Sequence, residues 1–407
     1  MISNLTLKNT FLFSVLVFFN LVNFKVQAQT LEIKKITTST DIMVGAQNTQ
    51  AYLPLIKGKK VGILTNQTGI IKSNLTSDQY DMSVVDYLLN IGANLTKIYA
   101  PEHGFRGTAD AGELIKDGKD IKTGLPIISL YGNSKKPSKE QLKNVDVMLF
   151  DLQDVGARFY TYISSLHYVM EACAENNIPV IILDRPNPNI SIIDGPTLEL
   201  KNKSFVGMHP IPIMHGMTIG EYGQMINGQK WLANNILCDL TIIPVLNYTR
   251  ESKYNLPIAP SPNLPNQKSI NLYPSLCFFE GTNVSSGRGT DLQFQIYGSP
   301  NLTNMSYSFT PRPNAGAKNP MNNGKVCHGE NLSQIADVEQ LEIKWLLKAY
   351  ANATNKDTFF NNFFIKLAGT TKLKQQIVSG TPEEAIRKSW EPDLQLFKTM
   401  RQPYLIY

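Results

Sequence analysis

The sequence lacks the short motifs that mark several large enzyme classes. It has no G-x-G-x-x-G after its first predicted strand, and no G-x-x-x-x-G-K-[ST], H-E-x-x-H or G-x-S-x-G. These absences count against nucleotide binding, zinc peptidase chemistry and the nucleophile turn of serine hydrolases. No spacing supports a metal site built from His103, Asp151, Asp154 and His215, so we expect neither a metal nor a cofactor.

The sequence has only a small excess of positive charge, and it has few cysteines. The 407 residues carry a formal net charge of +6 without any block of lysine or arginine, so a nucleic-acid partner is not indicated. The mild positive balance favours an anionic substrate such as cell-wall material. The four cysteines form no C-x-x-C pair, and we expect them to pack as free thiols. An oxidising compartment would permit a disulfide between Cys277 and Cys327.

Long apolar runs are confined to the N-terminus. Residues 11–22 are mostly apolar, Lys8 precedes them, and small residues suited to cleavage after Ala28 follow. We predict that residues 1–28 are a signal peptide and that the mature protein is periplasmic or secreted. A retained anchor is the alternative, although the run is short for a membrane span. Removing the segment takes Lys8 and Lys25 and no acid from the charge of +6, which leaves +4.

The first part of the chain alternates apolar runs with helical patterns. This alternation predicts a parallel α/β sheet covered by helices on both faces. We expect strands over residues 60–64, 95–100, 126–130, 145–150 and 178–183, with helices near residues 84–89 and over 161–176.

The chain changes character near residue 247, where a segment rich in proline, asparagine and serine begins. We predict a catalytic domain over residues 29–247 and a smaller α+β auxiliary domain over residues 248–407. The second domain should hold helices near residues 341–349 and after Thr381, whose side chain would cap a helix with Glu384 completing a capping box.

Four predicted strands end in turns that are rich in polar side chains. In a right-handed parallel arrangement, all four turns open on one edge of the sheet, where open α/β proteins bind their ligands. The turns are residues 65–69, 101–107, 151–162 and 184–188.

Glu102, in the second of these turns, is the leading catalytic candidate. An apolar wall from Phe105 or Tyr160 would raise its pKa and allow it to act as a general acid on a glycosidic oxygen. His103 would orient Glu102 or bind a sugar hydroxyl group. The alternative for Glu102 is a salt bridge to Arg106.

Asp151 and Asp184 each follow an apolar run directly, where an acid is hard to explain by packing. Either is a candidate for the second catalytic carboxylate or for a ligand of sugar hydroxyl groups. The alternative for Asp184 is an ion pair with the neighbouring Arg185.

The predicted substrate-binding residues follow from their chemistry. A guanidinium group matches a carboxylate through two hydrogen bonds, tyrosine rings stack on sugars, and glycine-rich loops let the backbone approach a ligand. His215 would face the crevice or solvent beside Thr218, an expected helix cap. The full set is Asn66, Gln67, Arg106, Gln153, Arg158, Tyr160, Tyr162, Arg185, His215, Glu280, Asn283 and Arg288.

Long motifs occur in a fixed order along the chain: PEHGFRG at residues 101–107, DRPNP at 184–188, HGMT at 215–218 and PSPN at 260–263. They resemble the NamZ-type exo-β-N-acetylmuramidases, a bacterial family formerly known as a domain of unknown function. The resemblance extends to the C-terminal sequence PYLIY. One departure is Asn189-Ile190, where relatives often have a glycine pair, which leaves the shape of that loop open.

The resemblance implies a Rossmann-like N-terminal domain and an active-site cleft between it and the C-terminal domain. It also implies release of terminal N-acetylmuramic acid from the non-reducing end of peptidoglycan fragments, with Glu102 as the catalyst. The partners would be muropeptides and disaccharides that end in this sugar. One alternative is a non-catalytic muropeptide-binding protein. Another is an amidase or esterase in which Thr161, Ser164 or Ser165 meets His103 or His167.

Overall fold

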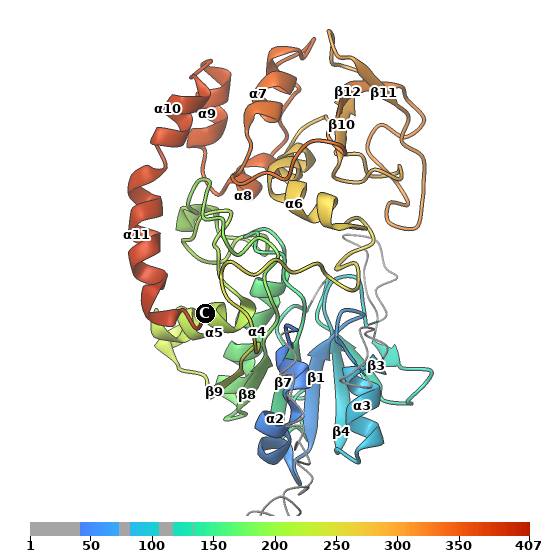
Figure 1. Cartoon of the computed structure of the whole chain (residues 1–407), viewed down its shortest axis with the longest axis vertical. Helices are drawn as coiled ribbons and strands as arrows, with labels where there is room; N and C mark the ends of the chain where they lie inside the picture. The colour runs from blue at the N-terminus through green and yellow to red at the C-terminus, as the bar shows by residue number, and fades with distance from the viewer. Residues whose placement is uncertain (1–40, 73–81, 106–116, 133) are drawn as a thin grey trace, which may run out of the picture. The chain divides into compact units, whose positions relative to one another are not determined.

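The computed structural model of the chain describes residues 41–72, 82–105, 117–132 and 134–407, so the predicted signal peptide lies outside the described residues. A seven-stranded sheet forms the N-terminal domain (Figure 1). All neighbouring strands are parallel except at one edge, where β5 runs antiparallel to β6. The order is β5 (Gly118–Lys119), β6 (Pro126–Ser129), β4 (Leu95–Ala100), β1 (Val61–Thr65), β7 (Val147–Asp151), β8 (Val180–Leu183) and β9 (Leu240–Ile243).

The apolar runs form strands because both faces of the sheet are covered. Every residue of β1, β7 and β8 is buried, which explains why these strands read as continuous apolar segments. Side chains alternate between the two faces. Val147 and Leu149 of β7 join one apolar cluster, and Met148 and Phe150 join the other. The predicted α/β class is therefore confirmed.

Helices cover each face of the sheet (Figure 1). On one face, α2 (Thr49–Ile56) and α3 (Val84–Asn90) contribute to one cluster. On the other, α4 (Tyr162–Glu175) and α5 (Ile219–Gly228) contribute to the second. The predicted cap of α5 is confirmed, since Thr218 and Glu221 form a capping box. Smaller elements are β2 (Ile70–Ile71), β3 (Met82–Ser83) and the 3₁₀ turns η1 (Gly45–Gln47), η2 (Leu200–Asn202) and η3 (Ala233–Asn235).

The smaller C-terminal domain contains a three-stranded antiparallel sheet and several helices. Residues Ile42–Tyr407 form one compact unit, and we propose residue 247, four residues beyond the end of β9, as the boundary within it. The elements are β10 (Ile296–Ser299), β11 (Tyr307–Phe309), β12 (Cys327–Asn331), α6 (Gln267–Leu276), α7 (Lys344–Ala351), α8 (Phe363–Ala368), α9 (Lys372–Val378), α10 (Glu383–Lys388), α11 (Glu391–Arg401), η4 (Cys277–Gly281) and η5 (Gln402–Tyr404).

The capping box predicted at Thr381 was wrong. Helix α10 begins at Glu383, and its N-cap residue is Pro382, which has no side-chain oxygen to accept from the first turn. The hydroxyl group of Thr381 is hydrogen-bonded to that of Ser379 instead, at 3.0 Å. Among the described residues, no helix has the length and apolar character needed to cross a membrane.

Candidate active site

The carboxyl ends of the central parallel strands meet at one edge of the sheet, as the sequence predicts. In this register β1, β4, β7 and β8 point the same way, so the four polar turns leave the sheet together. The turns after β4 and β7 reach a cavity, as does Tyr131 after β6. The turns after β1 and β8 support the neighbouring loops.

The cavity has a volume of about 390 Å³, which suits a small ligand. Residues of both domains line it, and most of its wall is aromatic or apolar. The lining consists of Glu102, His103, Tyr131, Lys135, Phe159, Tyr160, Thr161, Phe205, Val206, Ser261, Asn263, Leu264, Tyr273, Cys277, Glu280, Arg288, Phe294, Phe363 and Leu367.

Glu102 enters the cavity from the turn directly after β4. Two hydroxyl groups donate to its carboxylate: Tyr131 to Oε1 at 2.8 Å and Thr161 to Oε2 at 2.7 Å. Tyr131 follows β6 and Thr161 precedes α4, so two other parts of the sheet edge fix the orientation of the carboxylate. Phe105 does not join the cavity wall, because it packs into the core beneath β4.

His103 occupies an unusual backbone position in the same turn. Its φ of 70° lies in the left-handed region, which residues other than glycine rarely adopt. Gly104 follows with a φ of 76°, and its amide donates to Pro101 O at 3.0 Å. The turn therefore places Glu102 and the buried His103 side by side in the lining, and such strain is typical of functional sites.

A charged pair, Arg288 and Glu280, faces the cavity from the C-terminal domain. Nη1 of Arg288 lies 3.3 Å from Oε1 of Glu280, and Nη2 of Arg288 donates to Gly316 O at 3.4 Å. Burial raises the pKa of the nearby Cys277 thiol, and the charge of Glu280 raises it further. Glu102, Cys277 and Glu280 therefore line one cavity.

Aromatic rings form much of the remaining wall. Tyr160 and Tyr273 meet edge to face, with ring centroids 5.8 Å apart, and Phe294 lies 5.0 Å from Tyr273. The hydroxyl group of Tyr160 donates to Pro260 O at 2.9 Å, which ties the wall to the PSPN segment. Flat aromatic surfaces of this kind suit the apolar faces of a sugar ring.

Asp151 lies outside the cavity and is fully buried. Its carboxylate accepts two hydrogen bonds from Arg185, from Nε at 2.5 Å and from Nη2 at 3.0 Å. This bidentate pair satisfies both buried charges. The alternative considered for Asp184, an ion pair with Arg185, is not found, because the Arg185 guanidinium group binds Asp151 and its backbone amide donates to Asp184.

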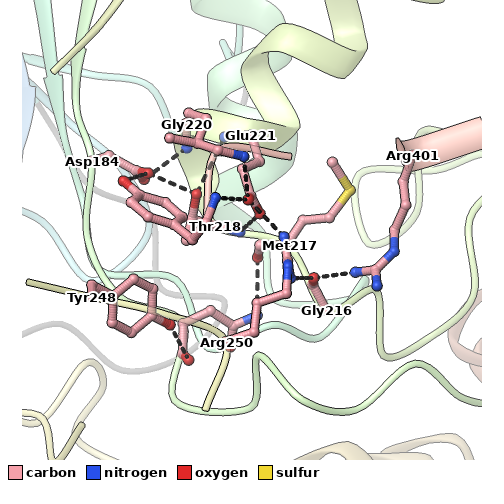
Figure 2. Close-up of polar contacts among 12 residues, drawn as sticks. Asp184, Gly216, Met217, Thr218, Gly220, Glu221, Tyr248, Arg250 and Arg401 are labelled. Atoms are coloured by element: carbon pink, nitrogen blue, oxygen red, sulfur yellow. Dashed lines mark hydrogen bonds and ion pairs between the residues drawn. The ribbon is translucent and has the colours of Figure 1, made fainter. Parts of the chain in front are cut away.

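Asp184 is also fully buried, beneath the start of α5 (Figure 2). It accepts from Thr218 Oγ1 at 2.7 Å, from the amide of Gly220 at 2.8 Å and from the hydroxyl group of Tyr407 at 2.8 Å. Burial raises the pKa of Asp184 to about 6, against these hydrogen bonds, which lower it. Its contacts indicate a role in holding the C-terminus rather than in contacting substrate.

Glu221 continues this cluster (Figure 2). Its Oε1 accepts from Arg250 Nη2 at 2.6 Å and from the amide of Ile406 at 2.8 Å. Arg250 and Arg401 both donate to Gly216 O. The C-terminal segment is thus fastened to the sheet domain by buried polar contacts.

Replacing Asp184 with asparagine is expected to leave kcat/KM nearly unchanged, whereas loss of a catalytic acid or base would cost about 10²–10⁴-fold. The variant should also change how stability depends on pH. The raised pKa means that the folded protein binds the proton more tightly than the unfolded chain does. Wild-type stability therefore falls by on the order of 2–3 kcal/mol as pH rises from about 4 to about 6, and this loss is absent in the variant.

Urea unfolding of both proteins on either side of that pH window measures the difference. The D184N variant should gain stability relative to wild type as the pH rises. A large loss of activity in a folded variant would return Asp184 to the catalytic candidates.

His215 and Arg158 are buried away from the cavity. Burial lowers the pKa of His215 to about 3, and the charges of Arg401 and Arg158 lower it further, so the imidazole is neutral. The side chain is buried and does not line the cavity, so it faces neither the crevice nor solvent. Arg158 donates to four backbone carbonyl groups. Nη1 reaches Pro196 O and Ile211 O, and Nη2 reaches Leu367 O and Ala368 O, at 2.7–2.9 Å.

The remaining predicted binding residues hold loops together behind the cavity wall. Asn66 donates to the hydroxyl group of Tyr162 at 2.6 Å, and Gln67 donates to Pro260 O at 3.2 Å. Gln153 donates to Pro186 O at 2.7 Å, and Asn283 donates to Thr358 O at 3.2 Å. Arg106 lies outside the described residues. The structure thus brings five predicted residues to the cavity: Glu102, His103, Tyr160, Glu280 and Arg288.

Several lining residues were not predicted from the sequence. Tyr131 follows a predicted strand, so its place at the sheet edge was open to prediction. Lys135 and Phe205 lie in irregular connections without periodicity, and their sequence carries no signal of their position. Asn263 lies in the PSPN motif, whose place in the fold the sequence does not show, and Tyr273 lies in α6, a helix that was not predicted.

The alternative of an amidase or esterase is not supported, because, among the described residues, the hydroxyl groups of Thr161, Ser164 and Ser165 form no hydrogen bond to His103 or His167. The Thr161 hydroxyl group donates to Glu102, and His167 contacts His209 at 3.0 Å and Glu171 at 3.5 Å. The four cysteines are free and buried, as expected, and Cys277 and Cys327 are not bridged. Within the described ranges, no three His, Cys, Asp or Glu side chains form a cluster suited to a metal ion.

Known proteins of one family match nearly the whole chain. Models for the N-terminal and C-terminal parts of the exo-β-N-acetylmuramidase NamZ match residues 61–268 and 271–407. The chain is 38% identical to the peptidoglycan β-N-acetylmuramidase NamZ of Bacillus subtilis (strain 168) in an alignment of 408 positions that covers 93% of each protein.

Two crystal structures of DUF1343 family proteins from Bacteroides fragilis NCTC 9343 are also similar. One superposes with a TM-score of 0.82 at 47% sequence identity, and the other with a TM-score of 0.75 at 27% identity. Each comparison covers 90% of this chain and 99% of the solved one.

Proposed function

The chain belongs to the NamZ family of exo-β-N-acetylmuramidases, and from this membership we propose that it is a glycosidase of the same specificity. It removes terminal N-acetylmuramic acid from the non-reducing end of peptidoglycan fragments. The observation that carries the proposal is Glu102, whose carboxyl group is oriented by Tyr131 and Thr161 inside a cavity of about 390 Å³.

Glu102 acts as the general acid in this proposal. The bond between C1 of the sugar and the glycosidic oxygen breaks, and that oxygen takes the proton of Glu102. Water then supplies the hydroxyl group on C1 and returns a proton to Glu102. Attack by water and attack by the sugar's own 2-acetamido group both require this proton on the leaving oxygen.

The other lining residues serve recognition. The rings of Tyr160 and Tyr273 provide apolar surface for the sugar, and Asn263 and Ser261 offer hydrogen bonds to hydroxyl groups. Glu280 holds Arg288 at the cavity edge. Asp151 and Asp184, satisfied by internal partners, maintain the loops that carry these side chains.

The same proposal includes the compartment. The N-terminal pattern of residues 1–28 directs export, and the mature enzyme acts in the periplasm or outside the cell on muropeptides and on disaccharides that end in N-acetylmuramic acid. Release of the free sugar there supports turnover and recycling of the cell wall.

A defined muropeptide with N-acetylmuramic acid at its non-reducing end tests the activity. Mass analysis should show free N-acetylmuramic acid and a remainder shortened by that one sugar. A fragment that ends in N-acetylglucosamine should stay intact. Binding without any product would identify the chain as a non-catalytic muropeptide-binding protein, and cleavage of the peptide instead would identify an amidase.

A further inference from the structure

The cavity contains two cationic side chains among its described lining residues, Lys135 and Arg288. They differ in what they already contact. Arg288 is held by Glu280 and by Gly316 O, so part of its hydrogen-bonding capacity is used inside the protein. Lys135 forms no ion pair with any residue in the described part of the chain, and its hydrogen bond to Gly132 O is long, at 3.4 Å.

Aromatic contacts fix the position of Lys135. Its Nζ lies 5.0 Å from the centroid of the Phe205 ring, a distance suited to a cation–π contact. The Phe205 ring stacks on Tyr168, with centroids 6.2 Å apart. Lys135 is therefore half-buried and supported from one side, with its charge available to the cavity.

The same aromatic contacts link Lys135 to the part of the cavity wall that carries Tyr131 and Glu102. The Phe205 ring lies 6.1 Å from the ring of Tyr131, and Tyr131 donates to Glu102. An ammonium group that forms no ion pair within the described part of the protein thus stands on the wall that carries the general acid. A charged group in such a site favours a ligand that brings the opposite charge and disfavours one that does not.

We propose that Lys135 binds the carboxylate of the lactyl group of the substrate and selects N-acetylmuramic acid over sugars that lack this group. The inference rests on the proposed function and assigns one specificity-determining residue to it. Lys135 touches the lactyl side of the sugar, while Glu102 serves the glycosidic oxygen. Neither Arg158 nor Arg185 can take this part, because both are buried outside the cavity.

Binding of N-acetylmuramic acid and of its methyl ester to the mature full-length protein tests the proposal by titration calorimetry. The ester keeps the shape of the ligand and removes its charge. Wild type should bind the acid at least about tenfold more tightly than the ester, as expected for a hydrogen bond to a charged group. The K135M variant should bind both ligands equally, and K135R should restore the preference.

Lys139 provides the matched control, since it lies in the same connection between β6 and β7 and is exposed. K139M should keep the wild-type preference. An unchanged preference in K135M, an equal loss of both ligands, or a preference lost in R288M but not in K135M would overturn the proposal. Product analysis distinguishes a failure of this proposal from a failure of the proposed function. A wild-type protein that releases no N-acetylmuramic acid contradicts the proposed activity, whatever the binding experiment shows.

Discussion

Replacing Glu102 with glutamine is expected to lower kcat for a disaccharide ending in N-acetylmuramic acid by about 10²–10⁴-fold, because an amide cannot supply the proton that the leaving oxygen needs. Folding should be preserved. Glutamine keeps one carbonyl oxygen to accept from Tyr131, and its amide group can donate to the Thr161 hydroxyl oxygen. The thermal midpoint should therefore stay close to that of wild type, and steady-state kinetics measure the loss.

The leaving group separates an acid from other roles. A 4-nitrophenyl glycoside releases a phenolate that leaves without protonation, so E102Q should lose much less activity on this substrate than on the disaccharide. Equal losses on both substrates would contradict the general-acid assignment. D184N is the matched comparison, since it also exchanges a carboxylate for an amide but does so at a buried aspartate outside the cavity.

The second large effect concerns stability. Replacing Arg158 with methionine is expected to lower the free energy of unfolding by about 4 kcal/mol or more, because four buried carbonyl groups lose their donor. Methionine fills similar space without donating any hydrogen bond. Two of the carbonyl groups belong to Leu367 and Ala368 at the end of α8, so the variant weakens the attachment of that helix to the sheet domain. Urea unfolding at neutral pH measures the change.

Arg312 is a suitable control for this experiment because its side chain is exposed. R312M should change the free energy of unfolding by less than about 0.5 kcal/mol. R158K should be less damaging than R158M, since an ammonium group still offers three donors. An R158M protein with wild-type stability but impaired sugar binding would restore the sequence-based role of Arg158 in substrate recognition.

The central strands of the sheet could be predicted because they are buried on both faces. A short continuous apolar run between helical patterns, such as the one that becomes β7, is typical of a central parallel strand, and the order of the polar turns follows from parallel pairing. The position of Glu102 was predicted by the same logic, since an acid directly after a buried strand lies at the ligand-binding edge.

Arginine and aspartate were harder to assign, because a sequence does not show the partner of a charge. Arg185 and Arg158 carry the groups that a carboxylate ligand needs, yet they bind Asp151 and backbone carbonyl groups. Lys135 and Phe205 pose the opposite problem. They meet through loop geometry that no periodic pattern encodes, so only the folded chain places them beside each other.

The fastening of the C-terminus has a consequence for biosynthesis. A ribosome makes the sheet domain first, but the hydroxyl group that completes the surroundings of Asp184 belongs to Tyr407, far beyond the end of β9 along the chain. Glu221 likewise lacks one hydrogen-bond donor, the amide of Ile406, until that residue has been made. The nascent sheet domain therefore cannot acquire all of its native contacts around α5 until residues 406 and 407 have been synthesised and have left the ribosome.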